Sequence, residues 1–174
     1  MVKFTIERKN GGKKMTDINN NIKTVCSFYA SEWHLVTMLL PNIDKKINKG
    51  IKITTILEKD LKNNMEALLK KLNLENNDKI LNIGWSKNKL ENVKELVEDN
   101  DCIIISGTVE YIKNVHTLIK ENISKDKCIT IIDCYNINEC EPELKQILDE
   151  HEIVLNTSGE KEKEEYDTTI RMAN

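Results

Sequence analysis

The sequence lacks the signals of several large classes of protein. No apolar stretch approaches the length of a membrane span, and the first ten residues are charged, unlike a signal peptide. The 26 basic and 29 acidic side chains are spread along the chain, and the formal net charge is -3 at pH 7. That pattern forms no basic patch for nucleic acid or for a membrane surface. We therefore expect a cytoplasmic protein that binds neither.

The motifs of common enzymes and metal sites are missing as well. There is no Gly-x-x-x-x-Gly-Lys-Ser/Thr phosphate loop, no Gly-x-Gly-x-x-Gly turn and no Gly-x-Ser-x-Gly elbow. The five cysteines form no Cys-x-x-Cys pair, and the three histidines are far apart in the sequence. We expect reduced, buried cysteines, no metal, no cofactor and no catalytic activity. Cys134 is the one cysteine that we also consider for redox chemistry, because it lies at the end of a predicted strand.

Short β-branched runs alternate with amphipathic stretches. Six runs read as strands: 23–28, 51–57, 79–85, 101–106, 127–133 and 152–156. Apolar residues at helical spacing lie between them, within 33–47, 61–72, 90–97, 109–119 and 144–151. Parallel strands need long crossover connections, which these stretches supply. The sequence thus predicts an α/β fold: a single three-layer domain with a mostly parallel sheet of about six strands flanked by helices.

The domain organisation follows from composition at the two ends. Residues 1–21 read as an N-terminal segment: Val2 to Ile6 is either an edge strand or a frayed end, and a flexible Gly- and Asn-rich stretch follows. Residues 22–160 form the predicted α/β domain. Residues 161–174 read as a charged tail in which Glu160 to Asp167 is solvated and Thr168 to Met172 is a possible last strand.

A ligand site is expected at one edge of this sheet. In parallel α/β sheets ligands bind at the carboxyl ends of the strands, so the side chains that follow each predicted strand are candidates. They are Tyr29, Glu32, Trp85, Ser106, Gly107, Thr108, Asp133, Cys134 and Tyr135. The alternative is structural: Ser31, Ser86 and Thr108 cap helices, and Tyr29 and Trp85 cover the rim of the sheet.

Three finer readings concern single groups. Ser106 to Thr108 offers backbone N–H groups to an anion at a helix N-terminus. Glu32 and Asp133 are a conceivable acid–base pair, although the sequence does not place them together. His116 lies on the apolar face of its helix, so we expect it to pack in the core and not to bind a ligand.

Two segments resemble a known family, the MEDS sensory domain of the methanogen and methylotroph DcmR type. The first is Val25-Cys26-Ser27-Phe28-Tyr29 with Glu32, followed by a helix with Pro41, then Gly50 and the run 51–57. The second is Ile131-Ile132-Asp133-Cys134-Tyr135-Asn136, followed by Leu144, Leu148, His151, the run 153–155 and Gly159. The chain has Thr24 and Asn136 where the family commonly has histidine and aspartate.

The resemblance implies a RecA- or KaiC-like fold that has lost its phosphate loop and senses small molecules. Our leading hypothesis is a cytoplasmic ligand-binding domain that takes a small, apolar molecule and signals to a regulatory protein partner. The second hypothesis is a degenerate RecA-like nucleotide binder that uses Ser106 to Thr108 for phosphate. The third is a non-catalytic interaction module in a homo-oligomer.

Overall fold

A six-stranded sheet forms the centre of the molecule in the computed structural model, which describes residues 21–87 and 90–165. The strand order is β2-β3-β4-β1-β5-β6, and every neighbouring pair is parallel except β5 and β6. The strands are β1 Ile22–Tyr29, β2 Ile53–Leu57, β3 Cys102–Ser106, β4 Ile129–Asn136, β5 Ile153–Asn156 and β6 Gly159–Glu162.

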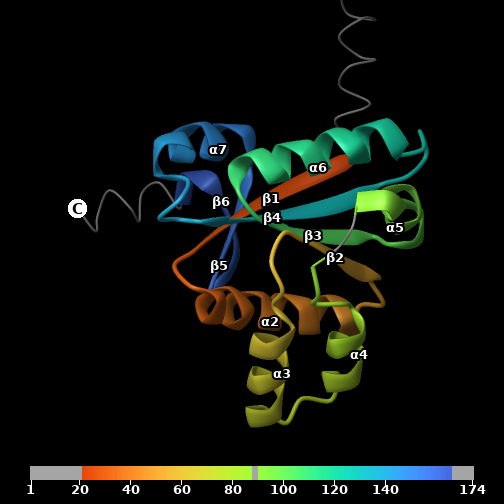
Figure 1. Ribbon diagram of the computed structural model, residues 1–174, viewed down its shortest axis with the longest axis vertical. Helices are drawn as coiled ribbons and strands as arrows, with labels where there is room; N and C mark the ends of the chain where they lie inside the picture. Colours follow the sequence, from red (N-terminus) through yellow and green to blue (C-terminus); the bar gives the residue numbers. More distant parts are fainter. Residues whose placement is uncertain (1–20, 88–89, 166–174) are drawn as a thin grey trace, which may run out of the picture.

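Helices cover both faces of the sheet, as Figure 1 shows, and make a three-layer structure. One face carries α2 Glu32–Asn48, α3 Lys62–Lys71 and α4 Asn77–Asn82. The other carries α5 Val93–Asp99, α6 Val109–Asn122 and α7 Leu144–Glu150, with the short 3-10 turns η1 Leu90–Asn92 and η2 Glu141–Glu143. The predicted fold class, a three-layer α/β domain with a mostly parallel sheet, is confirmed.

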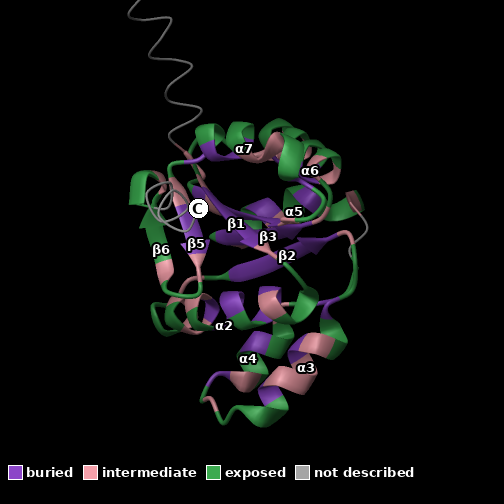
Figure 2. Ribbon diagram, turned by 90° about the vertical axis from the view of Figure 1, so that its left-hand side faces the viewer, coloured by how far each residue is buried: buried purple, intermediate pink, exposed green. Residues whose placement is uncertain are grey.

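Burial on both faces explains why the strands read as continuous apolar runs. Every residue of β2 and β3 is buried, and Figure 2 shows the strands enclosed between the two helical layers. Successive side chains alternate between faces. In β4, for example, Ile132 and Cys134 join the core under α2, whereas Ile131 and Tyr135 join the core under α6. We call these two sides of the sheet the α2 face and the α6 face.

The predicted strand at residues 79–85 is wrong. This segment forms α4 and the turn after it, with Ile80 buried and Leu81 37% exposed. Trp85 is 3% exposed, and its indole N–H donates to the Ile80 carbonyl at 2.7 Å, which ends the helix. A short apolar run has no periodicity that separates a strand from a buried helical turn. The segment packs beside β2 instead, where the Thr55 hydroxyl donates to the Gly84 carbonyl.

The sixth strand comes from the segment that was expected to be a charged, solvated tail. β6 pairs antiparallel with β5 from Gly159 to Glu162, so the sheet continues past residue 160. Its side chains are mostly exposed and charged, which discourages pairing of another chain along this edge strand. The predictions for Val2 to Ile6 and for Thr168 to Met172 lie outside the described residues.

No helix within the described ranges is long and apolar enough to cross a membrane.

Candidate functional site

The connections that leave the neighbouring strands β1 and β4 cross the sheet in opposite directions. The chain leaves β1 into α2 and returns at the far edge as β2, whereas it leaves β4 towards α7 and returns beside β1 as β5. The two exits remain joined, because the Ile137 N–H donates to the Tyr29 carbonyl at 2.9 Å. A reversal of this kind is where open α/β sheets bind ligands.

The turn after β3 lies beside this reversal and is closed by Glu58. The Glu58 carboxylate accepts the Thr108 N–H at 2.7 Å, and the Thr108 side chain caps α6 by accepting the Tyr111 N–H. A Cβ added at Gly107 would lie 2.5 Å from the Tyr111 ring and 2.7 Å from Glu58. The sequence therefore needs glycine at position 107 for Glu58 to approach. An internal carboxylate thus holds the donor that the nucleotide hypothesis assigns to a phosphate.

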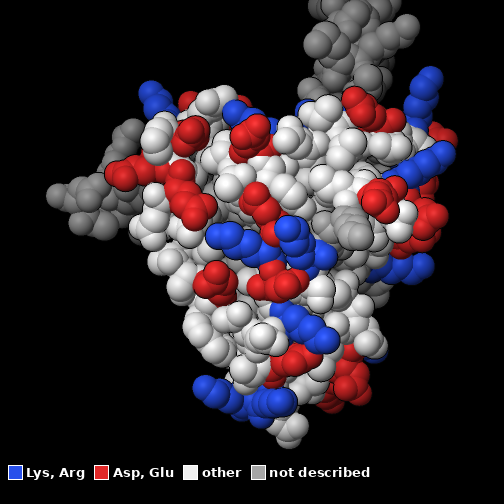
Figure 3. Space-filling model, in the orientation of Figure 1, with Lys and Arg blue, Asp and Glu red and all other residues white. Residues whose placement is uncertain are grey.

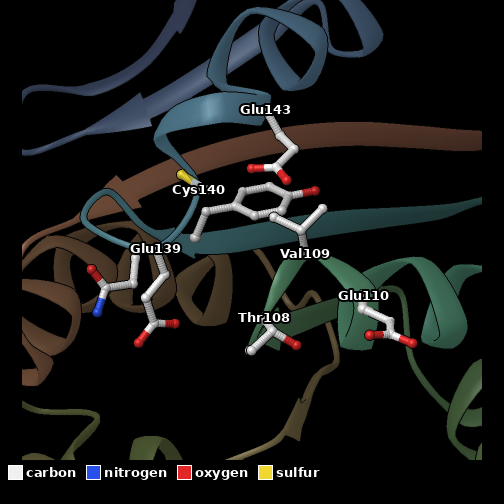
Figure 4. Close-up of a pocket in the computed structure, with 9 residues that line it drawn as sticks. Thr108, Val109, Glu110, Glu139, Cys140 and Glu143 are labelled. Carbon is white, nitrogen blue, oxygen red and sulfur yellow. The ribbon is translucent and has the colours of Figure 1, made fainter.

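A cavity of about 190 Å³ opens on the α6 face of this edge. Figure 4 shows two walls: one from the start of α6, with Thr108, Val109 and Glu110, and one from the β4–η2 segment, with Glu139, Cys140 and Glu143. Gly107, Tyr135 and Asn136 complete the lining. The second wall is held by a turn, in which the Glu139 and Cys140 N–H groups donate to the Asn136 carbonyl at 3.0 and 3.1 Å.

Tyr135 connects the cavity with the core. The side chain is 5% exposed, its ring stacks on Phe28 at a centroid distance of 6.0 Å, and it meets the His151 ring edge-on at 6.4 Å. Its hydroxyl makes no hydrogen bond to any part of the chain that the structure describes and, unlike the hydroxyl of Tyr111, it is not enclosed. Burial, followed by the charge of Asp133, raises the pKa of this hydroxyl, which stays protonated. The cavity therefore has in its wall a phenol hydroxyl that is open to solvent.

Beneath the Tyr135 layer, Asp133 is shared by two histidines. Both of its oxygens lie 2.8 Å from His116 Nε2, and Oδ2 lies 2.9 Å from His151 Nε2. The other ring nitrogen of His151, Nδ1, lies 2.6 Å from the Ile147 carbonyl. A carbonyl and a carboxylate both accept, so both nitrogens of His151 carry a proton and the ring is an imidazolium beside an ionised Asp133.

The pKa shifts agree with this protonation. Burial alone raises the pKa of Asp133, but the hydrogen bonds from His116 and His151 outweigh it and the net shift is downward. Burial alone lowers the pKa of His151, but the hydrogen bond and charge of Asp133 outweigh it and the net shift is upward. Asp133 and His151 thus form a buried ion pair, and His116 is a second hydrogen-bond donor to the same carboxylate. His116 is thus more than the packing residue that we expected from its helical stripe.

Because side chains alternate between the two faces of the sheet, only some of the predicted site residues lie at the cavity. Three of them, Gly107, Thr108 and Tyr135, line the cavity. Tyr29 and Ser106 lie on the α2 face, with their hydroxyl oxygens 3.4 Å apart. Glu32 is exposed in the first turn of α2, so it and the wholly buried Asp133 do not form the conceivable acid–base pair.

Three predicted residues lie in the interior, away from the cavity. Asp133 has no exposed surface and is held by its two histidines. Cys134 lies within β4, not at its end, and burial raises the pKa of its thiol far above the usual range, which opposes the redox role. Trp85 is core on the α2 face, because residues 79–85 form a helix and a turn instead of a strand.

The second wall of the cavity was missed in the sequence. Glu139, Cys140 and Glu143 follow β4 in a charged segment with Pro142, and such segments read as solvated connections. A signal was nevertheless present for the cluster below it. Two histidines on the apolar faces of predicted helices, with one aspartate in a buried strand, are typical of a buried ion-pair network.

No group of three or more His, Cys, Asp or Glu side chains within the described residues is arranged to hold a metal ion. No hydroxyl or thiol in those residues is hydrogen-bonded to His116 or His151, so a nucleophile–base–acid arrangement is not assembled there.

No protein-family model, curated protein or solved structure matches this chain.

Proposed function

We propose that the chain is a sensory domain that binds a small molecule in the cavity between α6 and η2 and reports its presence to a regulatory protein in the cytoplasm. The observation that carries this proposal is the Tyr135 hydroxyl, which belongs to a side chain only 5% exposed, lines the cavity and has no partner in the described chain. The hydroxyl is open to solvent, and a ligand in the cavity would replace water as its hydrogen-bond partner.

The lining favours a polar ligand over the apolar one of our first hypothesis. Thr108, Asn136 and the carboxylates of Glu139 and Glu143 face the same small space as the Tyr135 phenol. Few but well-placed polar groups orient ligands in such sites. The resemblance to the MEDS domain supports the sensory part of the proposal. The nucleotide alternative is weaker, because Glu58 already accepts the Thr108 N–H.

A structural change caused by ligand binding would pass to the core through Tyr135, because its ring contacts His151. A ligand that binds one arrangement of the β4–η2 segment better than another shifts the population towards it, which is the physical basis of a signal. The segment turns on Asn136 and leads directly into α7, so it is the natural element to carry the change to a partner.

Filling the cavity tests the proposal. Native and denatured mass spectra of the purified chain are compared for the wild type, for Val109→Trp in the α6 wall and for Lys113→Trp on the exposed side of the same helix. We expect a small-molecule adduct in the native spectra of the wild type and the Lys113→Trp control, and none in Val109→Trp. An adduct retained by Val109→Trp would place the ligand elsewhere.

If the wild type purifies without an adduct, a thermal-shift screen of small polar metabolites is the second test. A ligand that binds the native state raises the melting temperature. Circular dichroism of both variants confirms that each is folded. No adduct and no stabilising compound would overturn the proposed function.

A further inference from the structure

The cavity between α6 and η2 is charged with one sign only. Glu110, Glu139 and Glu143 line it, and none of its nine lining residues is basic. The three carboxylates take part in no ion pair or side-chain hydrogen bond within residues 21–87 and 90–165. Figure 3 shows acidic side chains gathered over α7 and the segment leading into it, whereas lysines lie across the middle of the same face. The charged side chains that line this cavity are therefore all acidic, and the basic ones lie outside it.

The start of α6 contributes a positive potential to the cavity, which is smaller than the negative potential of the three carboxylates. A helix N-terminus carries roughly half a positive charge and favours anions. Here Glu58 already accepts the Thr108 N–H at 2.7 Å, and Glu110 lies in the first turn of the helix. Three full negative charges in the lining outweigh a half charge that Glu58 already offsets. The potential inside the cavity favours a cation.

An organic cation fits better than a metal ion. The carboxylates belong to two opposite walls, with Glu110 on α6 and Glu139 and Glu143 on the β4–η2 segment (Figure 4). No three such groups in the described chain are arranged around one point as a metal ion requires. A molecule with charges at separate ends can meet both walls. The volume of about 190 Å³ holds about six water molecules at about 30 Å³ each, and hence a short chain of atoms.

The middle of the cavity suits the body of such a molecule. Tyr135 offers an aromatic ring and Val109 an aliphatic side chain, and both line the cavity together with the carboxylates. A cation is attracted to the face of an aromatic ring, and methylene groups pack on apolar side chains. The unpartnered Tyr135 hydroxyl, on a side chain 5% exposed, can accept an N–H from an ammonium group.

From this arrangement we infer that the ligand is a short aliphatic diamine, bound between Glu110 on the α6 wall and the carboxylates of Glu139 and Glu143 on the β4–η2 wall, with Tyr135 beside its chain. The inference rests on the proposed function and names the ligand class for the same cavity.

Three compounds of equal length separate charge from size. Isothermal titration of the full chain with 1,4-diaminobutane, 1,4-butanediol and succinate compares a dication, a neutral molecule and a dianion. We expect binding of the diamine alone. Equal binding of butanediol would show that size, not charge, is recognised, and binding of succinate alone would reverse the sign of the site; either overturns the inference. Loss of that binding in Val109→Trp would leave the proposed function standing.

Single amides in place of the carboxylates test the contacts. We expect Glu139→Gln and Glu143→Gln each to weaken diamine binding at least about tenfold, which is the effect of losing one charge-assisted hydrogen bond. Glu121→Gln, on an exposed position near the end of α6, is the matched control and should bind as the wild type does. Equal binding by all three variants would mean that the diamine associates with the acidic surface in general. That result, or no binding by the wild type, overturns the inference.

Discussion

The two faces of the sheet are both buried but differ in the polar groups that they enclose. On the α2 face the buried polar groups are neutral, such as Ser27, whose hydroxyl lies 3.0 Å from the Met38 sulfur. On the α6 face the centre of the core holds an ionised carboxylate between two imidazoles. Apolar packing is not directional, whereas a buried ion pair requires its partners in fixed positions. On the α6 face, therefore, a small displacement at the surface cavity can disturb the geometry of the buried ion pair.

The largest effect is expected on the α2 face. Trp85→Ala should lower the free energy of unfolding by about 3–5 kcal/mol, because it leaves a cavity in the core and removes the donor to the Ile80 carbonyl. Trp33→Ala is the matched control: this side chain is 47% exposed and stacks under Lys71, so we expect a loss of about 0.5–1 kcal/mol. Urea denaturation followed by circular dichroism measures both. Equal losses would contradict the place of Trp85 in the core.

Removing the charge on the α6 face comes next. Asp133→Asn keeps the shape of the side chain but breaks the ion pair with His151, and we expect a loss of about 3 kcal/mol. The neighbouring Cys134→Ala faces the α2 side and removes no charge, so about 1 kcal/mol should be lost. The same denaturation experiment compares them. If Cys134→Ala cost as much as Asp133→Asn, the difference between the faces would be one of packing alone.

The smallest effect is expected from pH, and on the α6 face it should come from the pair of Asp133 and His151. The pKa of Asp133 is lowered from 3.8 by folding, so its contribution is complete above that value and is lost as the pH falls through the lowered pKa. The pKa of His151 is raised from 6.5, so its contribution is complete below 6.5 and is lost as the pH rises through the raised pKa. Stability from this cluster is therefore greatest between about pH 4 and 6.5.

Denaturation curves measured within that range and on its alkaline side check the pH dependence. The wild type should lose stability on the alkaline side of pH 6.5, and Asp133→Asn should lose much less there, because the asparagine amide no longer favours the imidazolium. An identical alkaline loss in both proteins would assign the titration to other groups.

The sequence was sufficient for the layers of the fold and insufficient for the site, for physical reasons. Runs such as Ile103 to Ile105 have no polar alternation, because both sides of the strand are buried, and so they were recognised. The run at 79–85 is equally apolar but lies beside β2, and only tertiary contacts such as the bond from the Leu61 N–H to the Trp85 carbonyl determine its conformation. β6 is charged and was found only through its pairing with β5.

Within the site, residues next to a strand end were predicted and those brought by a turn were not. Tyr135 lies at the end of β4, so the rule for parallel sheets located it. Glu143 reaches the same cavity only because the chain turns at Asn136. The direction of a side chain near a strand end also depends on register, and a shift of one residue moves it to the other face. That is why Cys134 and Tyr135, adjacent in sequence, point into different cores.

The position of β1 has a consequence for how the molecule is assembled. The first strand of the sheet along the chain lies between β4 and β5, and its pairing joins Ile22 to Ile129 and Val25 to Ile153. β2, β3 and β4, by contrast, are neighbours in the order in which they are made. During synthesis, β1 leaves the ribosome well before both of its partners, and contacts so distant along the chain slow folding. Its apolar surface must stay unpaired until β4 and β5 emerge, and this interval is when the chain is most open to misassociation.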